Sequence, residues 1–323
     1  MDQAEIVAFL ERPEAHGGHG PVERVDTHIS HVFLAGDRVL KLKRAVKLPY
    51  LDFSTAEKRR EACDSELEIN RRTAPELYRA VTPIVRRADG GLGVGGDGAP
   101  ADWVVVMRRF DQSLLFDKMA ERSDLREGHV VAAAEAIARF HADAELAGGG
   151  AETLARIVAG NRTSVARAAV PRPLDEARAE ALHELCLERL GKHDALLDRR
   201  GAEGFVRDGH GDLHLRNICL IGGKPVLFDA IEFNPAFRRI DVFYDFAFLL
   251  MDLLHRGLGV HANRALDTYV GATGDVAGLE TLPLFIAVRA IIRGHIEATQ
   301  ARAKGGDLHW NAAAAYFELA ETA

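Results

Sequence analysis

The segment that most constrains this chain is residues 210–217, which read His-Gly-Asp-Leu-His-Leu-Arg-Asn. Asp212 precedes Asn217 by five positions, and Asp229 follows Asp212 by seventeen (229 − 212). Between them, residues 218–221 and 225–228 have the pattern of two short strands joined by a Gly-Gly turn. Such a hairpin would return Asn217 and Asp229 to the same place at its open end. The fold must therefore support a polar loop that runs directly into a hairpin.

These residue types suit phosphoryl transfer from ATP. That reaction needs a carboxylate to accept the proton of an attacking hydroxyl, and oxygen ligands to hold magnesium against the phosphates. Magnesium prefers hard oxygen donors such as Asp and Asn. We therefore predict Asp212 as the catalytic residue, Asn217 and Asp229 as metal ligands, and ATP and Mg²⁺ as cofactors.

The motif His-Gly-Asp-x-x-x-x-Asn with a downstream Asp resembles the catalytic loop and metal aspartate of the aminoglycoside phosphotransferase and choline kinase group. These are small-molecule relatives of the protein kinases. Residues 232–249 resemble the bacterial branch of this group that is often fused to a C-terminal P-loop kinase domain, so such a domain is expected in a longer protein. The resemblance covers roughly residues 25–300 and is sharp between 207 and 252.

The resemblance implies an α+β, bilobal, protein-kinase-like fold. Its small N-lobe would carry an antiparallel sheet plus one helix, and its larger C-lobe would be mainly helical. We expect residues 1–110, with an N-terminal helix, to form the nucleotide-binding lobe and residues 111–323 to form the catalytic and substrate lobe.

Residues 32–34 and 38–43 have the pattern of a hairpin that ends in an alternating strand. In a kinase-like fold this strand supplies the lysine that binds the α- and β-phosphates. Lys41 follows two apolar residues, as the group's lysine usually does, so we favour it. Lys43 remains the alternative because strand side chains repeat every two residues.

Three further nucleotide contacts follow from the resemblance. Glu66, on a helix whose start is predicted at residues 54–57 (Ser-Thr-Ala-Glu), would pair with the strand lysine, with Glu68 and Glu61 as alternatives. Ser30 lies where the phosphate loop is expected and is a candidate phosphate contact. Met107 begins the expected hinge, residues 107–110, whose backbone would bind the adenine edge.

A literal Gly-x-Gly-x-x-Gly occurs at residues 91–96, but it follows the lysine strand instead of preceding it, and no helix follows. We interpret it as turns between strands at 81–87 and 103–107. The same group implies that Asp245 anchors the catalytic loop and that His210 supports the loop's backbone. Glu232 lies near the group's second acidic position but at different spacing, which leaves its role open.

The net charge and the cysteines of the chain indicate which binding partners and which cellular compartment to expect. The formal net charge of −7 argues against nucleic acid and against an anionic membrane. Three separated cysteines without metal-ligand spacing favour a reducing cytoplasm, and the acidic N-terminal sequence is unlike a secretory signal.

Beyond about residue 113 the chain has helical character, with helices expected at 130–145, 175–197, 282–300 and 311–321. Four glutamates recur every fourth residue from 176 to 188, and we interpret them as a solvated helix face instead of an acidic wall for a cationic substrate. The acceptor pocket is expected from helices in the region 114–200, which carry no recognisable substrate motif.

The expected activity is transfer of the γ-phosphoryl group of ATP to a hydroxyl of a small molecule: an amino sugar, aminoglycoside, sugar or amino alcohol. A protein kinase is disfavoured because Arg before Asp212 and an Asp-Phe-Gly segment are both missing. The alternative from another class is a catalytically silent nucleotide-binding module that regulates a fused or separate kinase partner.

Overall fold

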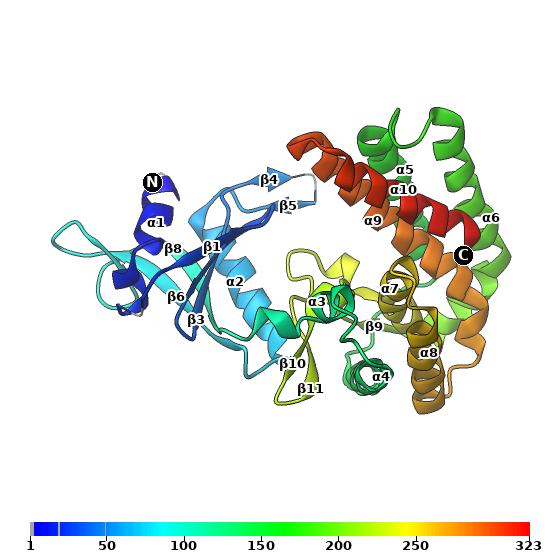
Figure 1. Ribbon diagram of the computed structural model, residues 1–323, viewed down its shortest axis with the longest axis horizontal. Helices are drawn as coiled ribbons and strands as arrows, with labels where there is room; N and C mark the ends of the chain where they lie inside the picture. The colour runs from blue at the N-terminus through cyan, green and yellow to red at the C-terminus, as the bar shows by residue number, and fades with distance from the viewer. Residues whose placement is uncertain (1–2, 19, 49) are drawn as a thin grey trace. The chain divides into compact units, whose positions relative to one another are not determined.

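The computed structural model of the chain describes residues 3–18, 20–48 and 50–323 (Figure 1). The chain forms two compact units. The first comprises Met1–Leu114 together with Val226–Pro235, and the second comprises Leu115–Pro225 and Ala236–Ala323. A ten-residue segment from the middle of the sequence is thus part of the N-terminal unit.

The first unit is built on a six-stranded antiparallel sheet with the strand order β1-β2-β3-β8-β6-β7. Its strands are β1 (Glu23–Asp26), β2 (Ser30–Ala35), β3 (Arg38–Lys43), β6 (Tyr78–Arg86), β7 (Leu92–Val94) and β8 (Ala99–Arg108). A separate strand pair joins β4 (Lys47–Leu48) to β5 (Leu51–Asp52). The expected antiparallel sheet is present, but residues 92–94 pair with β6 as a strand and are not only turns.

Strand β3 shows why the sheet has one apolar face and one charged face. Leu40 and Leu42 are buried in a core cluster with Ile6 and Leu10 of helix α1 (Gln3–Leu10). Side chains of a strand alternate between the two faces, so Lys41 and Lys43 point the other way. There they contact Glu66 of helix α2 (Ala56–Arg71).

Helix α2 begins where the sequence predicts. Thr55 has extended backbone angles and its hydroxyl accepts a hydrogen bond from the Lys58 N–H, which satisfies one of the unpaired donors of the first turn. The helix packs along β8 and β6. Its buried ion pair between Arg59 and Asp102 of β8 ties the helix to the sheet.

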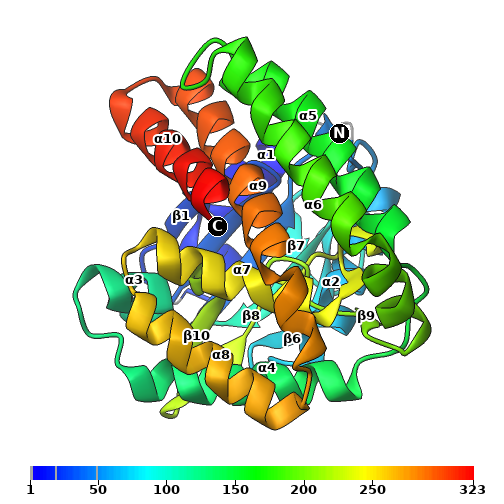
Figure 2. The same cartoon turned by 90° about the vertical axis from the view of Figure 1, so that its right-hand side faces the viewer.

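The second unit is mainly helical, as expected, and its helices are visible together in Figure 2. They are α3 (Phe116–Glu121), α4 (Glu127–Asp143), α5 (Ala151–Ala169), α6 (Glu176–Ala202), α7 (Val242–His255), α8 (Gly259–Thr273), α9 (Leu282–Lys304) and α10 (Asp307–Thr322). Strands β9 (Val206–Asp208) and β12 (Arg239–Asp241) pair with each other, and the predicted hairpin is present as β10 (Ile218–Ile221) and β11 (Lys224–Leu227). Helices α5 and α8 were not predicted individually.

Helix α7 lies at the centre of this unit, with α8, α9 and α10 packed around it (Figure 2). It is apolar on nearly all sides, and a helix with that composition must be buried. Two aspartates interrupt it, Asp245 and Asp252, and both are almost completely buried. They are seven residues apart, so they lie on the same side of the helix two turns from each other.

The α+β, protein-kinase-like fold class is confirmed by the small sheet unit and the larger helical unit. The row of glutamates on α6 is the solvated face that we expected. Glu176, Glu184 and Glu188 are exposed, and Glu180 pairs with Arg162 of α5 at 2.8 Å. Within the described part of the chain, no helix combines the length and the apolar character needed to cross a membrane.

Candidate active site

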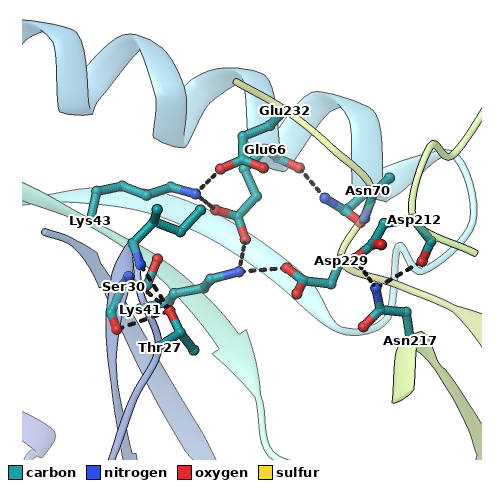
Figure 3. A network of polar contacts seen from close by, with 12 residues as sticks. Thr27, Ser30, Lys41, Lys43, Glu66, Asn70, Asp212, Asn217, Asp229 and Glu232 are labelled. Carbon is teal, nitrogen blue, oxygen red and sulfur yellow. Dashed lines mark hydrogen bonds and ion pairs between the residues drawn. The ribbon is translucent and has the colours of Figure 1, made fainter. Parts of the chain in front are cut away.

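The first unit brings together three residues that were chosen from separate segments of the sequence. The Lys41 Nζ atom lies 2.7 Å from Glu66 Oε1 and 2.6 Å from Asp229 Oδ1 (Figure 3). Glu61 and Glu68, the alternatives to Glu66, are on the exposed side of α2. The helix register therefore places Glu66 against the lysine, as the resemblance implied.

Lys43, the alternative to Lys41, is completely buried and is paired with two carboxylates. Its Nζ atom lies 2.5 Å from Glu66 Oε2 and is also bonded to Glu232. The Lys41 side chain keeps 12% of its surface exposed, whereas Lys43 has none. Of the two lysines, Lys41 has the better access to a nucleotide phosphate. Glu232, whose role the sequence left open, is thus the partner of Lys43.

Burial and ion pairing have opposite effects on the pKa values of Lys41, Lys43 and Glu66. Burial alone would lower the pKa of Lys41 and Lys43, but Asp229 and Glu66 beside Lys41, and Glu232 and Glu66 beside Lys43, raise the pKa of both lysines above the usual range. Burial would raise the pKa of Glu66, yet the two lysines lower it to about 2. All three therefore stay charged at neutral pH.

Asp229 occupies an unusual backbone conformation. Its φ is +61°, in the left-handed region that costs a non-glycine residue about 1 kcal/mol. The segment is nevertheless held in place because the Ala230 N–H donates to Asn70 Oδ1 at 2.9 Å and the Asp229 N–H donates to Tyr78 Oη at 3.2 Å. Its carboxylate is 44% exposed, so it is available to a cation.

Ser30 and Met107 are both buried in the sheet. The backbone of Ser30 pairs with Lys43, its N–H donates to Thr27 Oγ1 at 2.9 Å, and its own hydroxyl is fully buried. Met107 lies between β3 and β6. The next two N–H groups, at 108 and 109, donate to carbonyls of residues 77 and 37 within the same unit. Their roles in binding phosphate and adenine stay predictions.

The predicted catalytic loop, residues 210–217, lies in the second unit directly after β9. Asn217 Nδ2 donates to both the backbone carbonyl and the Oδ2 atom of Asp212, each at 2.9 Å (Figure 3). Both partners are acceptors, so the amide nitrogen must face Asp212 and the amide oxygen points elsewhere, where it could bind a cation. His214 Nε2 lies 3.3 Å from Asp212 Oδ2.

Basic side chains lie around Asp212. Burial alone would raise the pKa of this carboxyl, but His214, Arg293 and His210 hold the pKa below its ordinary value. The side chain is 35% exposed, so a substrate hydroxyl could reach it. The carboxylate is therefore ionised at neutral pH.

The buried aspartates of α7 anchor the loop by accepting hydrogen bonds from its backbone N–H groups. Asp245 accepts hydrogen bonds from the N–H groups of His210 (2.6 Å) and Gly211 (3.0 Å), which confirms the expected anchoring contact. Asp252 accepts from the Leu215 N–H at 3.0 Å. Gly209 approaches so closely that a Cβ atom there would lie 2.5 Å from Asp245 Oδ2.

Arg289 of α9 completes this support and was not predicted. Its Nη1 atom donates to the Gly211 carbonyl at 3.1 Å, and its guanidinium stacks on the Tyr244 ring at 3.8 Å. His210 also supports the loop, because the Asp212 N–H donates to His210 Nδ1 at 3.3 Å. A buried Arg and Asp in otherwise apolar helices were the sequence signals that could have revealed Arg289 and Asp252.

Because the Asp245 carboxylate anchors the loop, the free energy of unfolding should fall at acidic pH. Burial raises the pKa of Asp245, but His141, Arg289 and His210 outweigh it and lower the pKa to about 2. The ordinary value is 3.8, so its stabilisation is fully present above about pH 4 and is lost as the pH falls toward 2. A shift of this size corresponds to about 2 kcal/mol.

As the pH falls from 4 to 2, we expect the free energy of unfolding, measured with urea, to fall by about 2 kcal/mol more in the wild type than in Asp245→Asn, with no difference in pH dependence between pH 6 and pH 4. The comparison is between pH dependences, so the constant destabilisation of the variant does not matter. Equal pH dependence in the two proteins would show that Asp245 is not the responsible group.

Magnesium suits the residues that are present. Among the described residues, no group of three or more His, Cys, Asp and Glu side chains could hold a metal ion. Magnesium does not need one, because it is usually bound by one or two protein oxygen ligands together with substrate phosphates. Asp229 and Asn217 each carry an oxygen of this kind, and their role as magnesium ligands stays a prediction.

Solved structures share this fold. A choline/ethanolamine kinase family protein from Mesorhizobium loti matches with a TM-score of 0.60 at 17% identity, covering 100% of this chain and 94% of that one. A glucosamine kinase bound to glucosamine, ADP and inorganic phosphate has a TM-score of 0.54 at 18% identity and covers 99% and 82%. Aminoglycoside 2'-phosphotransferase-IIIa has a TM-score of 0.53 at 16% identity and covers 99% and 98%.

The chain therefore has the aminoglycoside phosphotransferase and choline kinase-like fold, and its structural neighbours are small-molecule kinases. No protein-family model matches it. Uncharacterized proteins of Mycobacterium tuberculosis and Mycobacterium bovis are 32% identical over 293 residues, which are 85% of this chain and 54% of theirs. The chain spans about half the length of these curated relatives, and a P-loop kinase domain in a longer protein stays a prediction.

Proposed function

We propose that this chain is a magnesium- and ATP-dependent phosphotransferase that moves the γ-phosphoryl group to a hydroxyl of a small molecule. The observation that carries the proposal is the contact of Lys41 with both Glu66 and Asp229. A phosphate-binding lysine held by a helix glutamate, beside a carboxylate suited to metal, is the arrangement that kinase-type phosphoryl transfer uses.

In the proposed reaction the acceptor oxygen forms a bond to the γ-phosphorus while the bond from that phosphorus to the β-γ bridging oxygen breaks, and ADP leaves. The acceptor's proton passes to the Asp212 carboxylate, which His214 and Asn217 orient. Lys41 binds the phosphates. When bound by Asn217 and Asp229, Mg²⁺ would neutralise negative charge on the phosphate oxygens.

Amino sugars, aminoglycosides, sugars and amino alcohols are the acceptor classes to test, because the structural neighbours include a choline/ethanolamine kinase family protein, a glucosamine kinase and an aminoglycoside phosphotransferase. ADP formation by the purified chain with Mg-ATP should rise with one panel member. A chain that binds Mg-ATP but turns over no acceptor in the panel would favour the silent regulatory module. Absence of Mg-ATP binding would exclude both functions.

A further inference from the structure

Five charged side chains of the first unit alternate in sign along a continuous path, which we call the charge chain: Asp229, Lys41, Glu66, Lys43 and Glu232. Lys41 bridges Asp229 and Glu66 at 2.6 and 2.7 Å, and Lys43 bridges Glu66, at 2.5 Å, and Glu232 (Figure 3). The proposed function uses Asp229, Lys41 and Glu66. It assigns nothing to Lys43 and Glu232.

The charge chain is open to solvent at one end only. The carboxylate of Asp229 is 44% exposed, while Glu66 and Lys43 are completely buried and the Glu232 side chain is 5% exposed. Charges at the protein surface are screened by water and salt, whereas buried charges interact strongly over short distances. A change of charge at Lys43 or Glu232 should therefore alter the electrostatic interactions of Lys41.

Glu232 is well fixed as a partner. Its backbone carbonyl accepts a hydrogen bond from Ser65 Oγ at 3.1 Å, one residue before Glu66. The next residue, Phe233, packs against the apolar cluster of Leu51, Phe53 and Ala62. The position of Glu232 relative to Lys43 is thus set by contacts that do not involve either charge.

Glu66 is shared by two lysines, and each lysine forms an ion pair with a different one of its carboxylate oxygens. Under the proposed function, Lys41 must leave Asp229 for the phosphates when Mg-ATP binds. The more of the Glu66 charge Lys43 neutralises, the less tightly Glu66 holds Lys41 in place. Glu232 acts in the opposite direction, because it draws Lys43 away from Glu66.

We propose that Lys43 and Glu232 are positioning residues that set how tightly Glu66 holds Lys41, and thereby set the affinity for Mg-ATP. The inference rests on the proposed function, in which Lys41 binds phosphate. Neither residue needs to touch the nucleotide, and the two have effects of opposite sign.

The test is the equilibrium Kd for Mg-ATP, measured by calorimetry without acceptor. Lys43→Met leaves Glu66 to Lys41 alone, so Glu66 offsets more of the Lys41 charge and less of that charge is left for the phosphates. Mg-ATP binding should therefore weaken about tenfold, within the range by which residues in one network couple. Glu232→Gln leaves Lys43 wholly to Glu66, so it should tighten Mg-ATP binding by about threefold. A merely structural role would weaken binding in both variants or in neither.

The matched control is Arg59→Met with Asp102→Asn, which removes the other buried ion pair between α2 and the sheet. This variant should lower the thermal midpoint but leave the Kd for Mg-ATP within about twofold of wild type. If Lys43→Met does not fold, Glu232→Gln alone decides, and a Kd equal to or weaker than wild type overturns the proposal. Failure of the wild type to bind Mg-ATP would overturn the proposed function, and this inference with it.

Discussion

Asp212→Asn should reduce turnover with the identified acceptor by about 10²–10⁴-fold, the usual contribution of a positioned proton acceptor. The asparagine side chain has nearly the same shape, but its amide cannot take the proton of the attacking hydroxyl. The Kd for Mg-ATP should stay within a few-fold of wild type, because Lys41, Glu66 and Asp229 are unchanged and the asparagine Oδ1 atom can still accept the hydrogen bond from Asn217 Nδ2.

The measurement is ADP formation under saturating acceptor, alongside calorimetric binding of Mg-ATP. Asp194→Asn is the matched control, since it makes the same change of charge at an exposed position on α6. A variant at 212 that keeps more than a tenth of wild-type turnover would remove Asp212 from the catalytic role.

Arg200→Met should have the largest effect on stability, a loss of about 3–5 kcal/mol in the free energy of unfolding. Arg200 is 1% exposed and makes four hydrogen bonds of 2.7–2.9 Å to the carboxylates of Asp241 and Asp275. Removing only the cation leaves two buried carboxylates without their partner, which is far more costly than removing the whole group.

Urea unfolding followed by circular dichroism would measure this. Arg162→Met is the control, because the Arg162–Glu180 pair is largely exposed and should contribute no more than about 1 kcal/mol. The triple variant Arg200→Met, Asp241→Asn, Asp275→Asn should recover most of the loss, since no buried charge is left unpaired. Equal losses at positions 162 and 200 would contradict the prediction.

Local patterns were sufficient to predict the strand, the helix and the hairpin that carry the candidate residues. The five-residue spacing between Asp212 and Asn217, the alternation along β3 and the start signal of α2 each depend on near neighbours in the sequence. For the same reason the hairpin after Asn217 was predicted almost to the residue.

The partners of buried charges could not be predicted in this way. Lys43 and Glu232 are 189 positions apart, and their contact depends on how a distant segment packs. Arg289 reaches Gly211 across 78 positions. The burial of Ser30 likewise follows from the register of β2 against β3, which a single sequence does not reveal.

The composition of the first unit bears on how the chain folds as it is synthesised. The unit needs residues 226–235, yet 111 residues of the second unit (115–225) are translated before them. At about 5–20 residues per second, that interval is on the order of ten seconds. During it, Lys41, Lys43 and Glu66 exist without Asp229 and Glu232, so the first unit is completed only after the ribosome has passed residues 210–217.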